Sequence, residues 1–273
     1  MKFIRHFLLA IQFFTRIPVT GKLADWVGFS PAMLRASAAH FAGVGWVVGT
    51  VAAGVYALLA LQISSVFAPA VAAFVSTVAT VLLTGAFHED GLADTADGLG
   101  GSVNRERALD IMKDSRVGAY GAIALVLALG TKVALLAALG SATDTHSQVV
   151  GLSQACTLML AAHVFSRACP MVLVRLLPHV GDTAASKSKP LADQITTGAL
   201  MSNFVWCLAL APLVWISPQP WIFAAAAAGA ALALVHMRRL FARRLQGFTG
   251  DCLGATQQVC ELAFYLGALV AVE

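Results

Sequence analysis

Charged residues are scarce in this chain. Lys, Arg, Asp and Glu make up 12% of its 273 residues, whereas ordinary globular proteins carry roughly 25%. Hydrophobic residues account for 59% of the chain, and the mean hydropathy is +0.79. So few charges cannot cover the surface of a soluble protein, and so much apolar sequence excludes intrinsic disorder. The composition is that of a protein that crosses a membrane several times.

Cysteine pairs are also missing, and the N-terminal segment departs from the pattern of a cleavable leader. The five cysteines are scattered and form no C-x-x-C pair, so they indicate neither a disulfide framework nor a metal site. The first 21 residues begin like a signal peptide, but Gln12 and Thr15 interrupt the apolar run and no A-x-A site follows. We therefore expect a retained N-terminal helix that is amphipathic or partly inserted.

Seven apolar stretches are long enough to span a bilayer, because a hydrocarbon core of about 30 Å needs roughly 20 helical residues. They lie near residues 38–60, 65–86, 117–140, 150–177, 199–216, 220–236 and 253–272. No internal repeat or low-complexity linker divides the chain. The sequence therefore predicts one all-α, polytopic membrane domain, a helical bundle over residues 1–273.

Basic residues set the expected orientation of this bundle. Fifteen of the eighteen Lys and Arg residues fall in the N-terminal segment and in alternate loops, whereas the loops near 61–64, 141–148 and 217–219 hold none. By the positive-inside rule the N-terminus is cytoplasmic and the C-terminus lies outside. Topology alone explains the net charge of +4, and no basic patch interleaved with aromatics suggests a nucleic-acid partner.

Acidic residues gather in one connection between the second and third stretches. Seven of the fourteen Asp and Glu residues lie within residues 89–114. Asp90, Asp94 and Asp97 are spaced i, i+4, i+7, so on a helix continuing the second stretch they share one face. These carboxylates repel one another, and no Lys or Arg occurs between residues 36 and 104. We expect a divalent cation to compensate, and oxygen ligands together with substrate phosphates favour Mg²⁺.

Glycines and a second charged block follow these acids. Gly98 and its neighbours let the backbone turn or a ligand approach closely. Lys113 and Arg116 beside an acid cluster suit a metal-bridged diphosphate, whose charge must be neutralised during phosphoryl transfer. The pattern favours a phosphoryl-transfer site at the cytoplasmic mouth of the bundle. A solvated loop with acids placed by chance is the alternative.

Two sequence blocks match a known pattern. FHEDGLADTADGL at residues 87–99 fits H-x-D-G-x-x-D-x-x-D-G, and IMKDSRVGAYG at 111–121 fits M-x-D-S-R-x-G-x-x-G. With the flanking FFTRIPV at 13–19 and QGFTGDCLGA at 246–255, the chain resembles the cobalamin 5′-phosphate synthase family over nearly its whole length. The segment 179–193 departs from the family's acidic, glycine-rich pattern, so no role is carried over to it.

The resemblance implies a bacterial inner-membrane enzyme that completes the nucleotide loop of cobalamin. A hydroxyl of α-ribazole, or of its 5′-phosphate, would attack adenosylcobinamide-GDP at the phosphorus carrying the aminopropanol arm, and GMP would leave. Other enzymes of cobalamin assembly and a second copy of the chain are compatible partners besides the substrates and the lipid bilayer.

The resemblance also implies roles for individual residues. Asp90, Asp94 and Asp97 would hold Mg²⁺ on the diphosphate, and Asp97 is our choice for accepting the hydroxyl proton. Arg116 would take the phosphates or the developing charge on GMP. The expected substrate-binding residues are Lys113, Ser115, Asp114, Arg167, Asp251 and Gly98.

Other classes of protein remain as alternatives. A CDP-alcohol phosphotransferase also uses clustered aspartates and Mg²⁺, but its D-x-x-D-G and G-x-x-x-D-x-x-x-D spacings are not met here. A membrane prenyltransferase would need a second aspartate cluster. A seven-span transporter would carry acids near the bilayer midplane, whereas most of these acids lie at the cytoplasmic mouth.

A few charges fall inside or beside the apolar stretches. Lys132 and Glu261 lie partway along the third and seventh stretches, and we expect them to pair within the bundle. Arg167 either snorkels towards the interface or faces the substrate cavity. Glu89 points away from the aspartate face and is expected to be peripheral. The arginines of residues 238–244 are expected to fix topology and anchor lipid.

Overall fold

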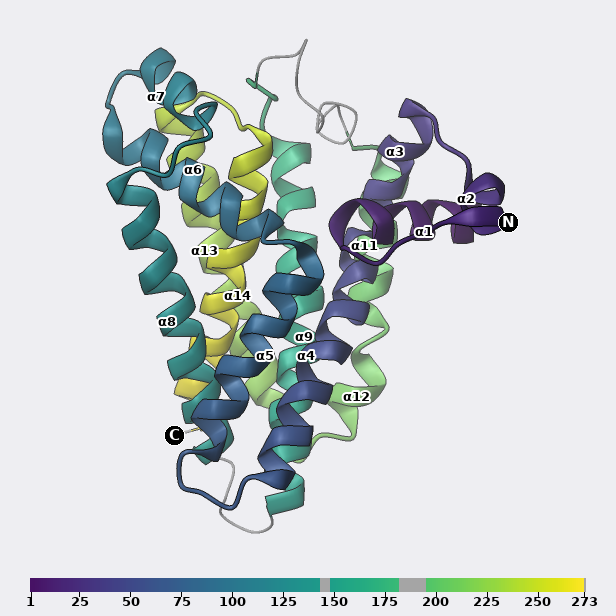
Figure 1. Cartoon of the computed structure of the whole chain (residues 1–273), viewed down its shortest axis with the longest axis vertical. Coiled ribbons are helices and arrows are strands. Elements are labelled where there is room, and N and C mark those ends of the chain that lie inside the picture. The colour runs from purple at the N-terminus through teal and green to yellow at the C-terminus, as the bar shows by residue number, and fades with distance from the viewer. Residues whose placement is uncertain (143–147, 182–194, 273) are drawn as a thin grey trace.

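The protein is a bundle of long helices (Figure 1). The computed structural model describes residues 1–142, 148–181 and 195–272. Within these residues six helices are long and apolar enough to cross a membrane, or seven if one bent pair counts as a span. The same part of the chain holds no β-strand. The expected all-α, polytopic membrane protein is confirmed.

The seven predicted stretches correspond to helices whose ends differ from the prediction by only a few residues, except that one helix extends further. They are α4 (Phe41–Gln62), α5 (Ala68–Thr84), α8 (Ala119–Ala142), α9 (Gln148–Leu176), α11 (Thr197–Leu208) with α12 (Ala211–Trp215), α13 (Pro220–Arg244) and α14 (Gly250–Val272). A bilayer forces its spanning segments to satisfy their own backbone hydrogen bonds, so apolar length alone locates such helices. The fifth span is broken between α11 and α12, and the sixth continues as helix through the arginines to Arg244.

The expectation that the aspartates lie on a helix continuing the second stretch is wrong. Their helix, α6 (Phe87–Gly101), is bent by 90° from α5. The bend arises because Gly85 and Ala86 both adopt left-handed backbone conformations, with φ of 65° and 57°. A side chain at residue 85 would also overlap the Arg16 guanidinium. Both the left-handed backbone and this close contact therefore favour glycine at the position. Figure 1 shows α6 running across the bundle near one end.

The N-terminal segment confirms the expected amphipathic helix. α1 (Lys2–Phe14) buries Leu9, Ala10 and Phe14 against the bundle and exposes Lys2 and Gln12. It is followed by α2 (Gly21–Val27), α3 (Pro31–Ser37) and the short 3-10 helix η1 (Ala38–His40). The N-terminal helices lie towards the same end of the bundle as α6, and the C-terminus lies at the other end (Figure 1).

One of the C-terminal arginines of α13 has a structural role that the lipid-anchor interpretation does not include. The Arg244 Nη2 donates hydrogen bonds to the carbonyl oxygens of Leu99, at 3.0 Å, and Ser102, at 2.6 Å. These carbonyls belong to the last turn of α6 and the residue after it, where a cation also interacts favourably with the helix dipole. From α7 (Arg105–Met112), Arg105 Nε donates to the Leu245 carbonyl oxygen at 2.6 Å. The carboxyl end of α6 is thus tied to α13.

Candidate functional site

α6 and α14 pack against each other at the level of their backbones. A Cβ atom added to Gly91 would lie only 2.8 Å from the carbonyl oxygen of Asp251. A Cβ atom added to Gly254 would lie 3.1 Å from the carbonyl oxygen of His88. Glycine at both positions therefore lets the first turns of the two helices touch. This contact brings Asp251 beside the aspartate face of α6, although more than 150 residues separate them in the sequence.

The carboxylates at this contact are not neutralised by the protein. Asp94 is half-buried, and the charges acting on it are those of Asp251, Asp90 and Asp97. Within the described residues, neither the Asp90 nor the Asp94 side chain forms a hydrogen bond or an ion pair, and Asp251 accepts only a 3.4 Å contact from the Thr249 hydroxyl. Carboxylates held together without a cation repel one another. Such a group is a natural place for a metal ion.

Asp97 points elsewhere, towards the start of α8. Its Oδ2 accepts a hydrogen bond from the Gly118 backbone N–H at 2.7 Å, and its Oδ1 accepts one from the Gly121 N–H at 2.8 Å. Side chains at either glycine would collide with this carboxylate. Asp97 therefore satisfies free amides at the amino end of α8, as capping carboxylates do. Its roles as metal ligand and proton acceptor stay predictions, because both oxygens are already engaged.

The second charged block forms the turn between α7 and α8. Arg116 Nε donates to both Asp114 oxygens, at 3.0 and 3.1 Å, and its Nη2 pairs with Oδ2 at 2.5 Å. Hydrogen bonds from the side chain and backbone of Arg116 lower the pKa of Asp114 to about 2. Lys113, 3.9 Å from Asp110, and Ser115 are both exposed. This turn is therefore an accessible, pre-ordered cationic segment.

Gly98 joins this turn to α6. A Cβ atom there would lie 2.4 Å from the Met112 side chain and 2.8 Å from the Ala108 carbonyl oxygen. Because Gly98 has no side chain, α7 can pack onto α6 at this position. Gly98 therefore has a packing role in this structure. Direct contact of Gly98 with a substrate remains a prediction.

Arg167 lies deep within the bundle. Its side chain is only 2% exposed, and its Nη1 donates to the His163 carbonyl oxygen at 3.0 Å. Glu261 and Glu89 are the acids whose charges act on it. The structure thus buries Arg167 beside acidic neighbours. Its predicted contact with substrate is untested.

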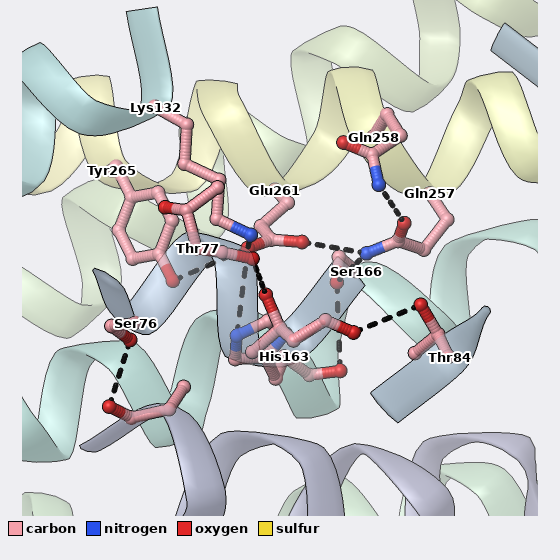
Figure 2. Close-up of polar contacts among 12 residues, drawn as sticks. Ser76, Thr77, Thr84, Lys132, His163, Ser166, Gln257, Gln258, Glu261 and Tyr265 are labelled. Atoms are coloured by element: carbon pink, nitrogen blue, oxygen red, sulfur yellow. Dashed lines mark hydrogen bonds and ion pairs between the residues drawn. The ribbon is translucent and has the colours of Figure 1, made fainter. Parts of the chain in front are cut away.

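The pairing of Lys132 with Glu261 is confirmed. Their Nζ and Oε1 atoms are 2.7 Å apart, and both side chains are almost completely buried. Figure 2 shows this ion pair joined to Gln257, Gln258 and Ser166. Of the segment 179–193, residues 182–193 lie outside the described residues.

Sequence reasoning missed the importance of Glu89. This side chain is buried, not peripheral, and its Oε1 accepts a hydrogen bond from Gln258 Nε2 at 3.0 Å. The available signal was the adjacent pair Gln257 and Gln258 inside the last apolar stretch. Amide side chains in a membrane span need polar partners and indicate a buried network.

The donor set fits Mg²⁺ in part. Within the described residues no three or more His, Cys, Asp or Glu side chains are close enough to form a complete metal site. Mg²⁺ usually takes only one or two carboxylates and completes its shell with substrate phosphates and water. Asp90 and Asp94 offer such oxygens without partners among the described residues, and Asp251 offers them with only the long Thr249 hydroxyl contact at its side chain. Two cavities, of about 690 and 460 Å³, are lined by other residues.

Comparison with known proteins identifies close relatives. A family model described as cobalamin-5-phosphate synthase matches residues 6–269. A protein of Polaromonas naphthalenivorans named adenosylcobinamide-GDP ribazoletransferase is 60% identical over 277 residues, covering 100% of both chains. Proteins of the same name from Leptothrix cholodnii and Vibrio cholerae are 47% and 42% identical, covering 98% of this chain and 96% and 94% of their own. No solved structure matches the chain.

Proposed function

This chain belongs to the cobalamin-5-phosphate synthase family, and from that premise we propose how its own residues carry out the reaction. The reaction joins α-ribazole, or its 5′-phosphate, to adenosylcobinamide-GDP and releases GMP. Family membership decides against the CDP-alcohol phosphotransferase, prenyltransferase and transporter alternatives. The observation that carries the assignment of the site is the group of unneutralised carboxylates where α6 meets α14.

The acidic group is where a metal ion would be held. Asp90, Asp94 and Asp251 would offer oxygen ligands to Mg²⁺, which would supply positive charge to neutralise the diphosphate of the activated corrinoid. The acceptor hydroxyl oxygen forms a bond to the phosphorus next to the aminopropanol arm and gives up its proton. The bond between that phosphorus and the bridging oxygen breaks, GMP leaves with the electron pair, and the proton is taken up by the departing phosphate of GMP. The role of the three aspartates is thus to bind the metal and, through its charge, to orient the diphosphate.

The turn between α7 and α8 binds the leaving group. Asp114 engages Nε and Nη2 of Arg116, which leaves the two Nη1 hydrogens of the guanidinium for a phosphate oxygen. Because Asp114 holds the guanidinium in one orientation, less side-chain entropy is lost when the phosphate binds. Lys113 and Ser115 are exposed on the same turn and supply further donors. Asp97 fixes the start of α8, and with it the end of this turn.

We further propose that the site opens to the cytoplasm from the inner membrane. The charged segments of α6, α7 and the N-terminal helices lie towards one end of the bundle, and the C-terminus lies at the other (Figure 1). The positive-inside rule makes the first end cytoplasmic and places the C-terminus in the periplasm. Adenosylcobinamide-GDP carries a charged diphosphate that does not cross a bilayer unaided, which supports a site on the side where this substrate is made.

The reaction is tested with the purified full-length protein in detergent micelles. We expect GMP release only when adenosylcobinamide-GDP, α-ribazole 5′-phosphate and Mg²⁺ are all present. EDTA should stop the release, and Mg²⁺ added in excess should restore it. No GMP release with both substrates would contradict the reaction, whereas release that continues in EDTA would contradict the metal site alone.

A further inference from the structure

A chain of buried hydrogen bonds runs from α6 into the bundle. It begins at Glu89, the neighbour of Asp90, whose Oε1 accepts from Gln258 Nε2 on α14 at 3.0 Å. The same Nε2 donates to the adjacent Gln257 Oε1 at 3.1 Å. Gln258 is 3% exposed and Glu89 is 7% exposed. Among the described residues, Gln258 gives the Glu89 side chain its hydrogen bond, and the other carboxylate oxygen of Glu89 has no partner.

The chain continues to two further helices. Gln257 Nε2 donates to Ser166 Oγ on α9 at 3.0 Å and to Glu261 Oε2 at 2.8 Å. Glu261 is paired with Lys132 on α8 (Figure 2). The buried charges balance, because Lys132 faces Glu261 and the Arg167 guanidinium interacts with both Glu261 and Glu89. This network therefore has no net charge that would attract an ion, and its effect is to connect helices.

The connection fixes the register of α6 against α14. The two helices touch through Gly91 and Gly254, where the lack of side chains brings their backbones together. A shift of α6 by one residue would move Glu89 by about 1.5 Å along its axis and break the bond to Gln258. The same shift would carry Asp90 and Asp94 past Asp251. The glycines permit the close contact, and the Glu89–Gln258 hydrogen bond selects its position.

We propose that Gln258 is a positioning residue, which holds Asp90 and Asp94 opposite Asp251 by bonding Glu89 on the buried side of the same helix turn. This inference rests on the proposed metal site. Gln258 contacts neither substrate nor metal. Loss of the Gln258 side chain should lower the affinity for the metal more than it lowers the turnover rate of the metal-bound enzyme. The aspartates are still present in such a variant, but α6 no longer holds Asp90 and Asp94 opposite Asp251.

The test measures the dissociation constant for Mn²⁺, used in place of Mg²⁺, by electron paramagnetic resonance of the full-length protein without turnover. It also measures the Mg²⁺ concentration that gives half-maximal GMP release, together with kcat at saturating Mg²⁺, and the two metal readouts should shift together. Gln258→Met should raise both metal readouts about 10-fold or more, the loss expected when a group that orients metal ligands is removed. The exchanged pair, Glu89→Gln with Gln258→Glu, keeps an amide–carboxylate bond and the total charge, and should restore the wild-type values. Gln154→Met is the matched control, because Gln154 is a buried glutamine that bonds Gln219 at 3.4 Å, away from the site.

The outcomes separate this role from the proposed function. Wild-type protein whose GMP release ignores Mg²⁺ would contradict both the metal site and the positioning role. Suppose instead that the wild-type protein requires Mg²⁺. The positioning role alone would be contradicted if Gln258→Met did not raise the required Mg²⁺ concentration, or if Gln154→Met raised it equally. If Gln258→Met does not fold, the exchanged pair decides, since an Mg²⁺ requirement well above the wild-type value would overturn the proposal.

Discussion

Replacing Asp94 with asparagine is expected to lower kcat/KM for GMP release by about 1,000-fold, the factor that corresponds to losing roughly 4 kcal/mol of charge stabilisation by a bound metal. Asp94 has this effect because it lies among Asp90, Asp97 and Asp251 and has no hydrogen-bond or ion-pair partner for its side chain among the described residues. Asparagine keeps the size of the side chain and removes its charge. Steady-state GMP release at saturating Mg²⁺ measures the loss.

A second readout separates this effect from misfolding. The substitution relieves repulsion between carboxylates, so without metal the Asp94→Asn protein should unfold at a temperature no lower than wild type. Asp110→Asn is the matched control, because Asp110 is an exposed acid of the neighbouring helix whose ion pair with Lys113 is long, at 3.9 Å. Equal activity losses in both variants, or a marked loss of thermal stability in Asp94→Asn, would contradict the assignment of Asp94.

Replacing Lys132 with methionine is expected to reduce the free energy of unfolding by about 3–5 kcal/mol. The substitution leaves Glu261 as a buried carboxylate without its ammonium partner, which is 2.7 Å away in the native bundle. Reversible unfolding in mixed detergent micelles measures the change. The exposed Lys22 on α2 provides a control, since Lys22→Met should have almost no effect.

The double variant Lys132→Met with Glu261→Gln tests the physical reason. Glutamine at this position can accept with its oxygen from Gln257, which contacts Glu261 Oε2 at 2.8 Å, and its amide NH2 can donate to the Tyr265 hydroxyl, which contacts Oε1 at 3.4 Å. Because no unpaired buried charge remains at this position, the double variant should regain more than half of the lost stability. A double variant as unstable as Lys132→Met would show that the ion pair is not the source of the effect.

Hydropathy located the membrane helices well, and the reason is physical. A span in lipid must form all its own backbone hydrogen bonds, so twenty apolar residues leave the chain little choice but a helix. The pairing of Lys132 with Glu261 was predictable for a related reason, because an unpaired charge inside a span is costly and charges of opposite sign there form ion pairs. Both inferences depend on local composition and on the cost of unpaired polar groups.

The direction of α6 was not predictable in this way. Spacing places Asp90, Asp94 and Asp97 on one helical face wherever the helix points. The 90° bend depends on left-handed backbone at Gly85 and Ala86, and on Arg16 packing over that glycine from a distant part of the chain. Ala86 has a side chain that disfavours this conformation, so tertiary contacts must impose it.

The separation of Asp97 from the other two acids also arises from tertiary structure. The i, i+4, i+7 spacing treats the three carboxylates as equivalent, yet α8 packs so that Gly118 and Gly121 present their backbone N–H groups to Asp97 alone. Asp251 joins the site from the other side through the contact of Gly91 with α14. Sequence spacing thus located the acidic helix, and helix packing chose which carboxylates meet.

Binding of Mn²⁺ in place of Mg²⁺ tests the central claim most directly. Electron paramagnetic resonance counts the Mn²⁺ ions bound to the full-length protein in the presence of adenosylcobinamide-GDP. We expect wild-type and Asp110→Asn protein to bind the ion alike, and Asp94→Asn and Asp251→Asn to lose it. Undiminished Mn²⁺ binding in both of these variants would show that the metal is not held where α6 meets α14, and would contradict the account.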